Sequence, residues 1–326
     1  MRDKALLSYL FIISIFFLLA NIASAISPNA ISVDVIPANP IPYQNVTITL
    51  SSFAANLDSV NIQWIVDDKS ILSGIGKKSF SLTTKAANIN TRVEIRIFLP
   101  DGEINKNINI RPGVLVLLWQ ANDSHVPPFY KGKALPTPGS EIKVVAMPEI
   151  TINNKMIDSK SMTYDWKQNY NNRQNASGYS KNSFTFINDY LEDSDNVSVV
   201  ASTINQQYSS ESSIIINTSN PEIHFYKNDQ ELGTRWEQSL QNNHVVSGEE
   251  TIIAEPYFIS PQDIRVPDLL FYWSLGGRSV SVPSYIKNLI PIKAEIGTSG
   301  TTKLKLEIEN TEKIYQTAKK EININF

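Results

Sequence analysis

The segment Val60–Leu82 opens with Val60-Asn61-Ile62-Gln63-Trp64-Ile65-Val66 and closes with Ser73-Gly74-Ile75-Gly76-Lys77-Lys78-Ser79-Phe80-Ser81-Leu82. Its first part alternates apolar and polar residues, which is the period of a β-strand with one buried face. The two glycines predict a turn, and the alternation around Phe80 predicts a second strand. The segment decides the fold because most of it occurs more than once.

A second copy follows about a hundred residues later. Met162, Tyr164 and Trp166 alternate in the same way, and Ser177–Phe186 matches Ser73–Leu82 at its Ser, Gly, Lys, Ser and Phe positions. A third copy is more divergent. It alternates at Leu269, Phe271, Trp273 and Leu275, but keeps only Lys287-Asn288 and Ile290 of the second part. Repetition at this period predicts an array of three similar units.

The repeats and the proline-containing linkers set the predicted boundaries. We predict an N-terminal segment at 1–25 and three domains at 26–112, 113–219 and 220–326. The second and third domains each carry a long insertion directly after their opening strand, at 120–140 and 227–248. Each domain is long enough to bury a core of its own.

Short strand-like segments recur along the whole chain, and no segment after residue 25 shows a convincing helical period with caps. This pattern predicts an all-β protein made of three tandem antiparallel β-sandwiches, preceded by an N-terminal signal or anchor helix. The residues expected in the sandwich cores are Trp64, Phe80, Trp166, Phe184 and Trp273.

The three Trp strands resemble the third strand of immunoglobulin-like (Ig-like) modules in bacterial exported and surface proteins, including PKD-like repeats. The opening sequence Pro37-Ala38-Asn39-Pro40, followed by Val46-Thr47-Ile48, is also similar to the start of many such modules. The resemblance covers residues 31–326. It implies two facing antiparallel sheets per module with the Trp between them. The inter-sheet Cys pair of the family is absent, as is the Asp-Gly-Asp-type turn of many PKD repeats.

The first 25 residues have the pattern of an export signal. Arg2 and Lys4 precede an apolar run from Ala5 to Leu19, and Ala23-Ser24-Ala25 offers a cleavage site. We favour cleavage after Ala25, which predicts a secreted or cell-envelope protein. The alternative is an uncleaved anchor in the cytoplasmic membrane, because residues 5–22 approach the roughly 18 to 20 residues that span a bilayer.

The composition excludes some partners. The net charge of −3 and the isoelectric point near 5.7 give no electrostatic basis for nucleic-acid binding. The chain has no Cys, so an exported form has no disulfides and its sandwiches depend on packing alone. This suits a bacterial or archaeal exported protein better than an animal one.

No catalytic motif is convincing. Gly74–Ser79 lacks the spacing of a phosphate-binding loop, and its second copy replaces Gly76 by Ser180. No Gly-x-Ser-x-Gly turn is present. We therefore predict that the protein is not an enzyme and needs no cofactor.

Metal binding has weak sequence support. The pair Asp67-Asp68 and the run Glu192-Asp193-Ser194-Asp195-Asn196 could supply oxygen ligands to calcium, but solvated loops explain them as well. The three histidines, His125, His224 and His244, have no paired zinc-ligand spacing. We expect no metal site.

The insertions hold the best candidates for contacts. Phe129 and Tyr130 follow a stiff Pro-Pro, and Arg235 and Trp236 stand together in the second insertion. Exposed aromatic and Arg side chains on loops are typical of binding surfaces. They can equally cover the sandwich edge or the neighbouring module, and we favour this second interpretation.

We therefore predict an exported, non-enzymatic cell-surface or envelope protein that acts as an adhesion, binding or structural module, with a protein or glycan as its partner. One alternative is an envelope, pilus or secretion assembly component tethered by its N-terminal helix. Another is a carbohydrate-binding accessory protein of a secreted hydrolase system.

Overall fold

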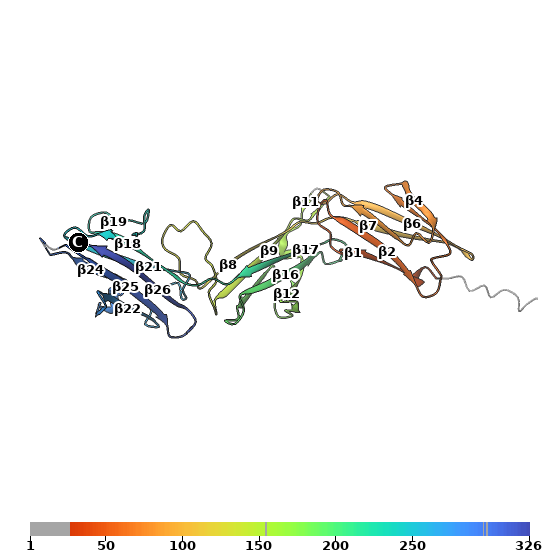
Figure 1. The fold of residues 1–326 in the computed structure, drawn as a ribbon. Helices are drawn as coiled ribbons and strands as arrows, with labels where there is room; N and C mark the ends of the chain where they lie inside the picture. The colour runs from red at the N-terminus through yellow and green to blue at the C-terminus, as the bar shows by residue number, and fades with distance from the viewer. Residues whose placement is uncertain (1–26, 154, 296, 298) are drawn as a thin grey trace, which may run out of the picture. The chain divides into compact units, whose positions relative to one another are not determined.

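The computed structural model describes residues 27–153, 155–295, 297 and 299–326 (Figure 1). The predicted signal at 1–25 lies outside these residues. The first of two compact units contains the described residues up to Val114 with Ile150–Lys155 and Tyr208–Glu211. The second unit contains Leu115–Glu149, Met156–Gln207 and Ser212–Phe326.

The first unit is built on two facing sheets, preceded by the 3₁₀ turn η1 (Pro28–Ala30). One sheet has the order β1-β2-β5 and the other the order β4-β3-β6-β7. Their strands are β1 (Ile31–Ile36), β2 (Asn45–Ser52), β3 (Asn61–Val66), β4 (Lys69–Ile75), β5 (Ser79–Thr83), β6 (Thr91–Leu99) and β7 (Gly102–Ile110). Ile48, Trp64 and Ile95 come from both sheets and have no exposed surface, so the sheets share one core.

A second sheet pair follows, with the orders β15-β9-β8 and β13-β12-β16-β17, and β14 also pairs with β12. Its strands are β8 (Leu115–Ala121), β9 (Glu141–Pro148), β12 (Thr163–Gln168), β13 (Asn171–Asn172), β14 (Gly178–Tyr179), β15 (Ser183–Ile187), β16 (Ser194–Ser202) and β17 (Ser209–Asn217). The short elements β10 (Thr151–Ile152), β11 (Lys155–Met156) and η2 (Ser159–Ser161) lie between β9 and β12. The rings of Trp166 on β12 and Phe184 on β15 lie 5.7 Å apart and join the two sheets.

The third sheet pair has the orders β19-β18-β21-β24 and β20-β26-β25-β22-β23. Its elements are β18 (Glu222–Asp229), β19 (Gly233–Thr234), β20 (His244–Val245), β21 (Glu249–Tyr257), β22 (Leu269–Leu275), β23 (Arg278–Val280), η3 (Ser284–Ile286), β24 (Leu289–Lys293), β25 (Thr301–Asn310) and β26 (Thr317–Asn325). β20 runs parallel to β26, whereas β18, β21 and β24 pair in antiparallel fashion. Phe225, Trp273 and Leu306 belong to its core.

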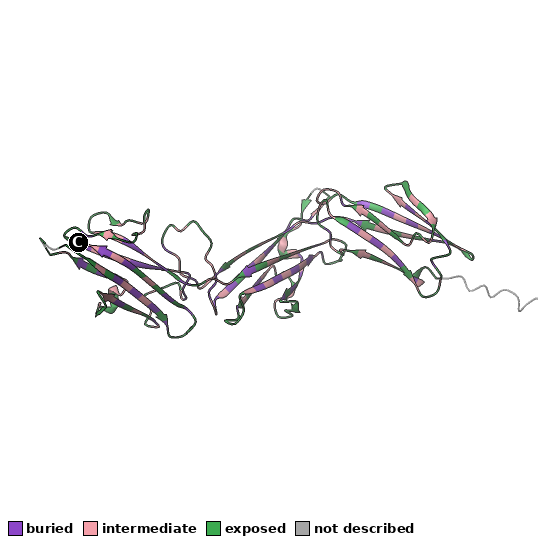
Figure 2. Ribbon diagram, in the orientation of Figure 1, coloured by how far each residue is buried: buried purple, intermediate pink, exposed green. Residues whose placement is uncertain are grey.

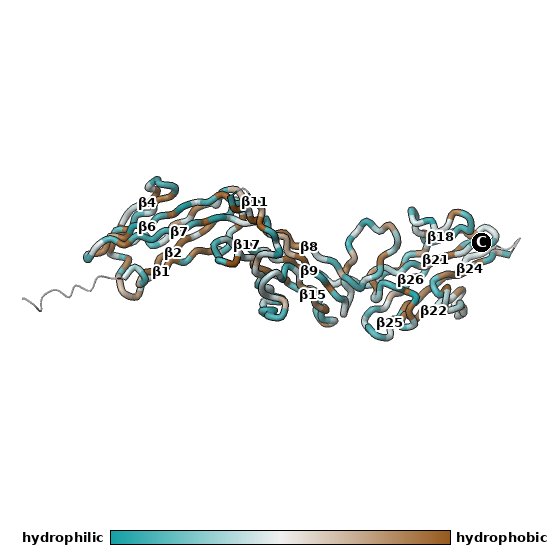
Figure 3. Tube along the Cα trace, turned by 180° about the vertical axis from the view of Figure 1, so that it is seen from behind, coloured by the Kyte–Doolittle hydropathy of each residue, from teal (hydrophilic) through white to brown (hydrophobic). Residues whose placement is uncertain are grey.

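Alternation of buried and exposed residues explains why these segments form strands. In β6, Val93, Ile95 and Ile97 are buried and the intervening residues face outward. Figure 2 shows the same alternation along most long strands, and Figure 3 shows that apolar residues follow the strands while polar residues dominate the connecting loops. Apolar and polar residues alternate because successive side chains point to opposite faces of a sheet, one packed in the core and the other in solvent.

The three Trp residues make the same hydrogen bond. Each indole N–H donates to the main-chain oxygen of a Lys, at 2.7 Å from Trp64 to Lys77, 2.9 Å from Trp166 to Lys181 and 2.8 Å from Trp273 to Lys287. A buried indole needs such an acceptor, because an unpaired polar group in a core is costly. The repeat therefore places one carbonyl group over each buried Trp.

In each copy, the carbonyl group of the residue after that Lys binds to the sheet that does not contain the Trp. The oxygen atoms of Lys78, Asn182 and Asn288 each accept, at 2.8 Å, the N–H of a residue in the second strand of that sheet, namely Leu50, Ala146 or Ala254. Three residues after each Lys comes a core side chain, Phe80, Phe184 or Ile290. The Lys-x-x-apolar spacing therefore encodes a connection between the two sheets.

The prediction of an all-β fold made of antiparallel sheets is confirmed, and so is the resemblance to tandem Ig-like sandwiches. One detail differs from constant-type Ig domains, in which the strand after the Trp strand joins the sheet of the first strand. Here that strand, β4, pairs with the Trp strand β3, so the sheet of β1 has three strands and the sheet of β3 has four. The division into three domains and their boundaries stay predictions.

Candidate functional site

The insertion at 120–140 is an ordered loop with its own hydrogen bonds. Ser124 Oγ donates to the oxygen of Leu135 at 2.8 Å, and the N–H of Glu141 donates to Asp123 Oδ1 at 2.9 Å. The N–H of Ala121 donates to the oxygen of Ala134 at 3.1 Å. The loop therefore closes on its base and presents its tip, residues 125–131, as a fixed surface.

His125 attaches that tip to the end of β21. Its N–H donates to Ile259 O and its own carbonyl oxygen accepts from the N–H of Phe258, both at 2.7 Å. Its imidazole places Nδ1 at 2.6 Å from Gln262 O and Nε2 at 2.6 Å from Glu255 Oε1. A main-chain oxygen can only accept, so Nδ1 donates to Gln262 O, and Nε2 faces the buried Glu255.

Two polar contacts extend this attachment. Lys313 pairs with Asp123 at 2.5 Å, and Gln316 Nε2 donates to Pro138 O at 2.9 Å. Gln316 is fully buried and also accepts the N–H of Ser260 at 2.8 Å. Both ends of the first insertion therefore contact residues of the third sheet pair within the second compact unit.

The aromatic residues of the two insertions converge on one strand pair. Tyr130 contacts Tyr257 edge-on with ring centres 5.8 Å apart, and Trp236 lies on Tyr226 at 5.2 Å. The hydroxyl groups of Tyr226 on β18 and Tyr257 on β21 are 2.7 Å apart. We call Tyr130, Tyr257, Tyr226 and Trp236 the aromatic row.

Burial differs along the aromatic row. Tyr226 is buried, while Tyr130, Tyr257 and Trp236 are half-buried. Burial raises the pKa of the Tyr257 phenol, and the hydrogen bond with Tyr226 raises it further. Tyr257 is thus uncharged at neutral pH, and the row presents ring edges and hydroxyl groups.

Exposed residues stand at both ends of the row. Phe129 is 87% exposed with a positive φ of 63°, and it precedes Tyr130. Arg235 is exposed beside Trp236, and its N–H donates to Lys227 O at 3.0 Å. The structure therefore brings Tyr130 and Trp236 into one row and leaves Phe129 and Arg235 open to solvent at its ends.

The second insertion is tied to the sheet by a buried carboxylate. Glu250 accepts from Lys227 Nζ, and His244 Nε2 lies 2.8 Å from its other oxygen. Burial alone would raise the pKa of Glu250, but these hydrogen bonds outweigh it and hold the pKa below its ordinary value. A charged Glu250 therefore links β18, β20 and β21.

The residues considered as metal ligands are engaged in other contacts. Lys85 donates to Asp67 at 2.8 Å and lowers the pKa of that carboxyl group. Asp195 is buried and accepts from Gln168 Nε2 at 2.6 Å. Each histidine has a Glu within 3.1 Å of its Nε2. Among the described residues, no three His, Asp or Glu side chains form a group that could hold a metal ion.

No family model matches the chain, and no curated protein matches its sequence. The fibronectin(III)-like modules of Clostridium thermocellum CbhA are 14% identical over 58% of this chain and 94% of theirs, with a TM-score of 0.28. Three N-terminal domains of the outer capsid protein Hoc of bacteriophage RB49 are 8% identical over 90% and 97%, with a TM-score of 0.26. The central fibronectin-III array of RIM-binding protein is 9% identical over 90% and 95%, with a TM-score of 0.31. These distant neighbours say nothing of function.

Within the described part of the chain, no helix is long and apolar enough to cross a membrane.

The residues that hold the candidate site together are hard to find in the sequence. His125 stands out there only as a possible zinc ligand, and Tyr226 and Tyr257 belong to no motif. Tyr226 could have been predicted as an aromatic residue on the outer face of its strand, because it follows the inward-facing Phe225 directly. The pairing of His125 with Glu255 could not have been predicted, since the two residues are far apart in sequence.

Proposed function

We propose that this chain is an exported, non-enzymatic protein of three tandem Ig-like modules that binds a surface protein or glycan through the aromatic row and its exposed ends. The supporting observation is the convergence of Tyr130 and Trp236, from separate insertions, on Tyr257 and Tyr226. Rigid aromatic side chains flanked by Arg are the groups that most often supply binding energy at interfaces.

The geometry also supports a structural role for the same region. The first insertion makes main-chain, ionic and aromatic contacts with the third sheet pair. Interfaces between domains of one chain are often loose, so a bound loop limits their motion. A module held in one orientation presents its partner surface with less loss of entropy on binding.

The binding experiment uses residues that the fold does not need. Phe129→Ala and Arg235→Ala remove exposed side chains at the two ends of the row. The double variant should bind isolated cell envelopes of the producing organism about tenfold more weakly than the unchanged chain. Tyr43→Ala, at a residue 73% exposed in the first unit, is the matched control. Equal binding by all three chains would refute the proposed surface.

Export is tested separately. Mass spectrometry of the exported chain should find its N-terminus after Ala25. Retention of residues 1–25 would favour the tethered assembly component. Binding to insoluble polysaccharide, lost in the double variant, would favour the accessory protein of a hydrolase system.

A further inference from the structure

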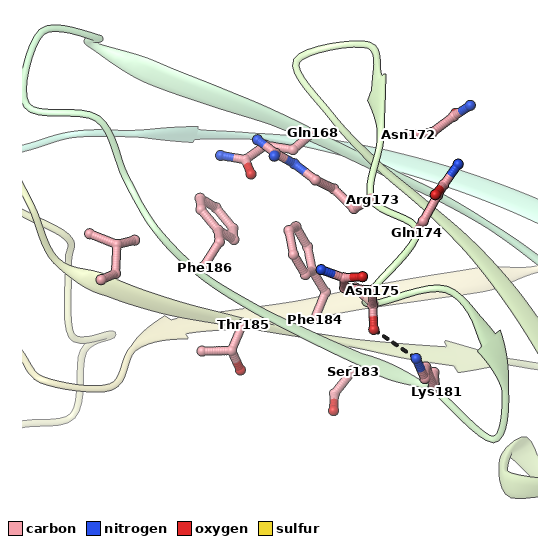
Figure 4. Close-up of a pocket in the computed structure, with 12 residues that line it drawn as sticks. Gln168, Asn172, Arg173, Gln174, Asn175, Lys181, Ser183, Phe184, Thr185 and Phe186 are labelled. Carbon is pink, nitrogen blue, oxygen red and sulfur yellow. Dashed lines mark hydrogen bonds between the residues drawn. The ribbon is translucent and has the colours of Figure 1, made fainter.

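A groove of 770 Å³ opens on the side of the second sheet pair, between β15 and the segment Gln168–Ala176 (Figure 4). All of its lining residues belong to the second compact unit. It shares no residue with the aromatic row.

The groove follows the edge of a strand. All five residues of β15, Ser183–Ile187, line it. Figure 4 shows the rings of Phe184 and Phe186 pointing towards Gln168 and Arg173, with Ser183 and Thr185 on the other side. Successive side chains of a strand point to opposite faces of its sheet. A groove that both sets of side chains line must therefore run along the edge of the strand, beside its main chain.

The sheet leaves this edge open. β15 is the outermost strand of the order β15-β9-β8, so its outer N–H and C=O groups face no strand of its own sheet. In constant-type Ig domains a fourth strand occupies the corresponding position. The groove therefore lies where one more strand would extend the sheet.

A broken strand in the opposite sheet creates the space. In the first sheet pair, β4 pairs with β3 along Lys69–Ile75 with a single irregularity between Trp64 and Ile65. In the second pair, the equivalent strand is split into β13 and β14. The intervening residues, Arg173–Ser177, form a turn instead of a strand. Its ends are held by hydrogen bonds from Arg173 N–H to Trp166 O at 2.8 Å and from Trp166 N–H to Ser177 Oγ at 2.9 Å.

The lining carries positive charge. It includes Arg173 and Lys181 and no Asp or Glu. Lys181 Nζ donates to Asn175 O at 2.7 Å, whereas Arg173 is exposed and forms no ion pair with a described residue. The floor is apolar, because Phe184 and Phe186 stack at 5.0 Å. A ligand that fits carries a carboxylate opposite Arg173 and an apolar side chain over the phenyl rings.

We propose that this groove binds an extended acidic peptide of a partner protein, which pairs with β15 as an added strand. Pairing with the five residues of β15 would engage about 17 Å of peptide. The peptide's main chain would form hydrogen bonds with the outer N–H and C=O groups of β15. Its alternate side chains would contact Arg173 and the rings of Phe184 and Phe186. A glycan would use the charge and the rings but not the strand edge.

The test is selection of a random nine-residue phage-displayed peptide library on the purified full chain. We expect enrichment of acidic, β-prone sequences, with about tenfold weaker binding of the selected synthetic peptides to the Arg173→Glu variant. Methylation of alternate peptide amides should weaken binding similarly, because it removes strand hydrogen bonds. Arg278→Glu, the same charge reversal at an exposed residue of β23 outside the groove, should bind normally.

Three results would overturn the proposal: no enrichment, equal binding to Arg173→Glu, or binding that survives methylation of each of the two sets of alternate amides, tested one set at a time, because one of the two sets must face β15. Arg173-dependent binding of polygalacturonate without any peptide ligand would assign the groove to an acidic glycan instead. Because the groove and the aromatic row are separate, the outcome is independent of the Phe129 and Arg235 experiment.

Discussion

The buried Trp residues show how a single side chain serves both packing and connection. Trp166 is 1% exposed, contacts Phe184 across the sheets and donates its indole N–H to Lys181 O. Removing the ring empties a large volume in the core, and it also leaves the Lys181 oxygen without this donor. The same residue type at the same place in each copy is therefore a requirement of the fold, not of binding.

Trp166→Ala should destabilise the second sheet pair by about 3 to 5 kcal/mol. Tyr170→Ala, at an 86% exposed residue, should change stability by less than about 0.5 kcal/mol. Urea unfolding followed by amide exchange within β12 and β15 measures both variants. Comparable losses for the two variants would show that Trp166 is not a core residue.

Glu250 is a residue whose charge holds an insertion. Its pKa lies below the ordinary value of 4.5, so the folded state binds the proton more weakly than the unfolded state. Its contribution to stability is therefore complete above about pH 4.5 and is lost as the pH falls through the lower folded-state pKa.

Thermal unfolding of the full chain between about pH 6 and pH 3 should show this loss in the transition of the third sheet pair. Glu250→Gln should be less stable at neutral pH and should flatten the acid dependence, because an amide does not titrate in this range. Identical pH profiles for the two chains would mean that other carboxylates cause the acid response.

At the scale of strands and turns, two copies of the repeat solve one conformational problem with different residues. Gly76 has φ of 68° and Ser180, at the equivalent place, has φ of 63°. Their N–H groups donate to Val60 O and Met162 O, each four residues before its Trp. A positive φ is unstrained for Gly and strained for Ser, so this turn lowers the stability of the second copy relative to the first.

Exchanging these residues should change stability in opposite directions. Ser180→Gly should stabilise the second sheet pair by up to about 1 kcal/mol, after the greater entropy of Gly in the unfolded chain is counted. Gly76→Ser should destabilise the first by about 1 to 2 kcal/mol, since a Cβ there would lie 3.0 Å from Asp58 O. Denaturant midpoints of the two variants test the signs, and a loss in both would indicate that Ser180 makes a contact worth more than its strain.

The elements show what could be predicted from sequence. The Trp strands and β6 were predictable because each carries a period of two that matches one buried face. The split of β13 from β14 was not, because Asn171–Ser177 contains no alternation and its turn depends on pairing with β12. Only half of the candidate site could be predicted from sequence. Tyr130 and Trp236 stand out as aromatic residues in loops, but their partners on β18 and β21 do not.

At the scale of the molecule, the first insertion controls how two sheet pairs of the second unit are joined. The segment before β18 is short, and its Ser219 donates from N–H and Oγ to Pro136 O in the insertion, at 2.8 and 3.0 Å. The tip adds the His125 pairing with Phe258 and Ile259. The loop thus holds the linker and the following strand together, which a linker alone does not do.

Replacing His125 and Tyr130 by Ala should loosen this connection without removing a residue of either sheet. Amide exchange at Phe258 and Ser219 should accelerate at least about tenfold, because the loop then opens more often on its own. Phe129→Ala is the matched control in the same loop, since Phe129 is exposed and lies between the two contacts. If that control accelerates exchange as much as the double variant, the backbone of the loop, and not the His125 and Tyr130 side chains, fixes the junction.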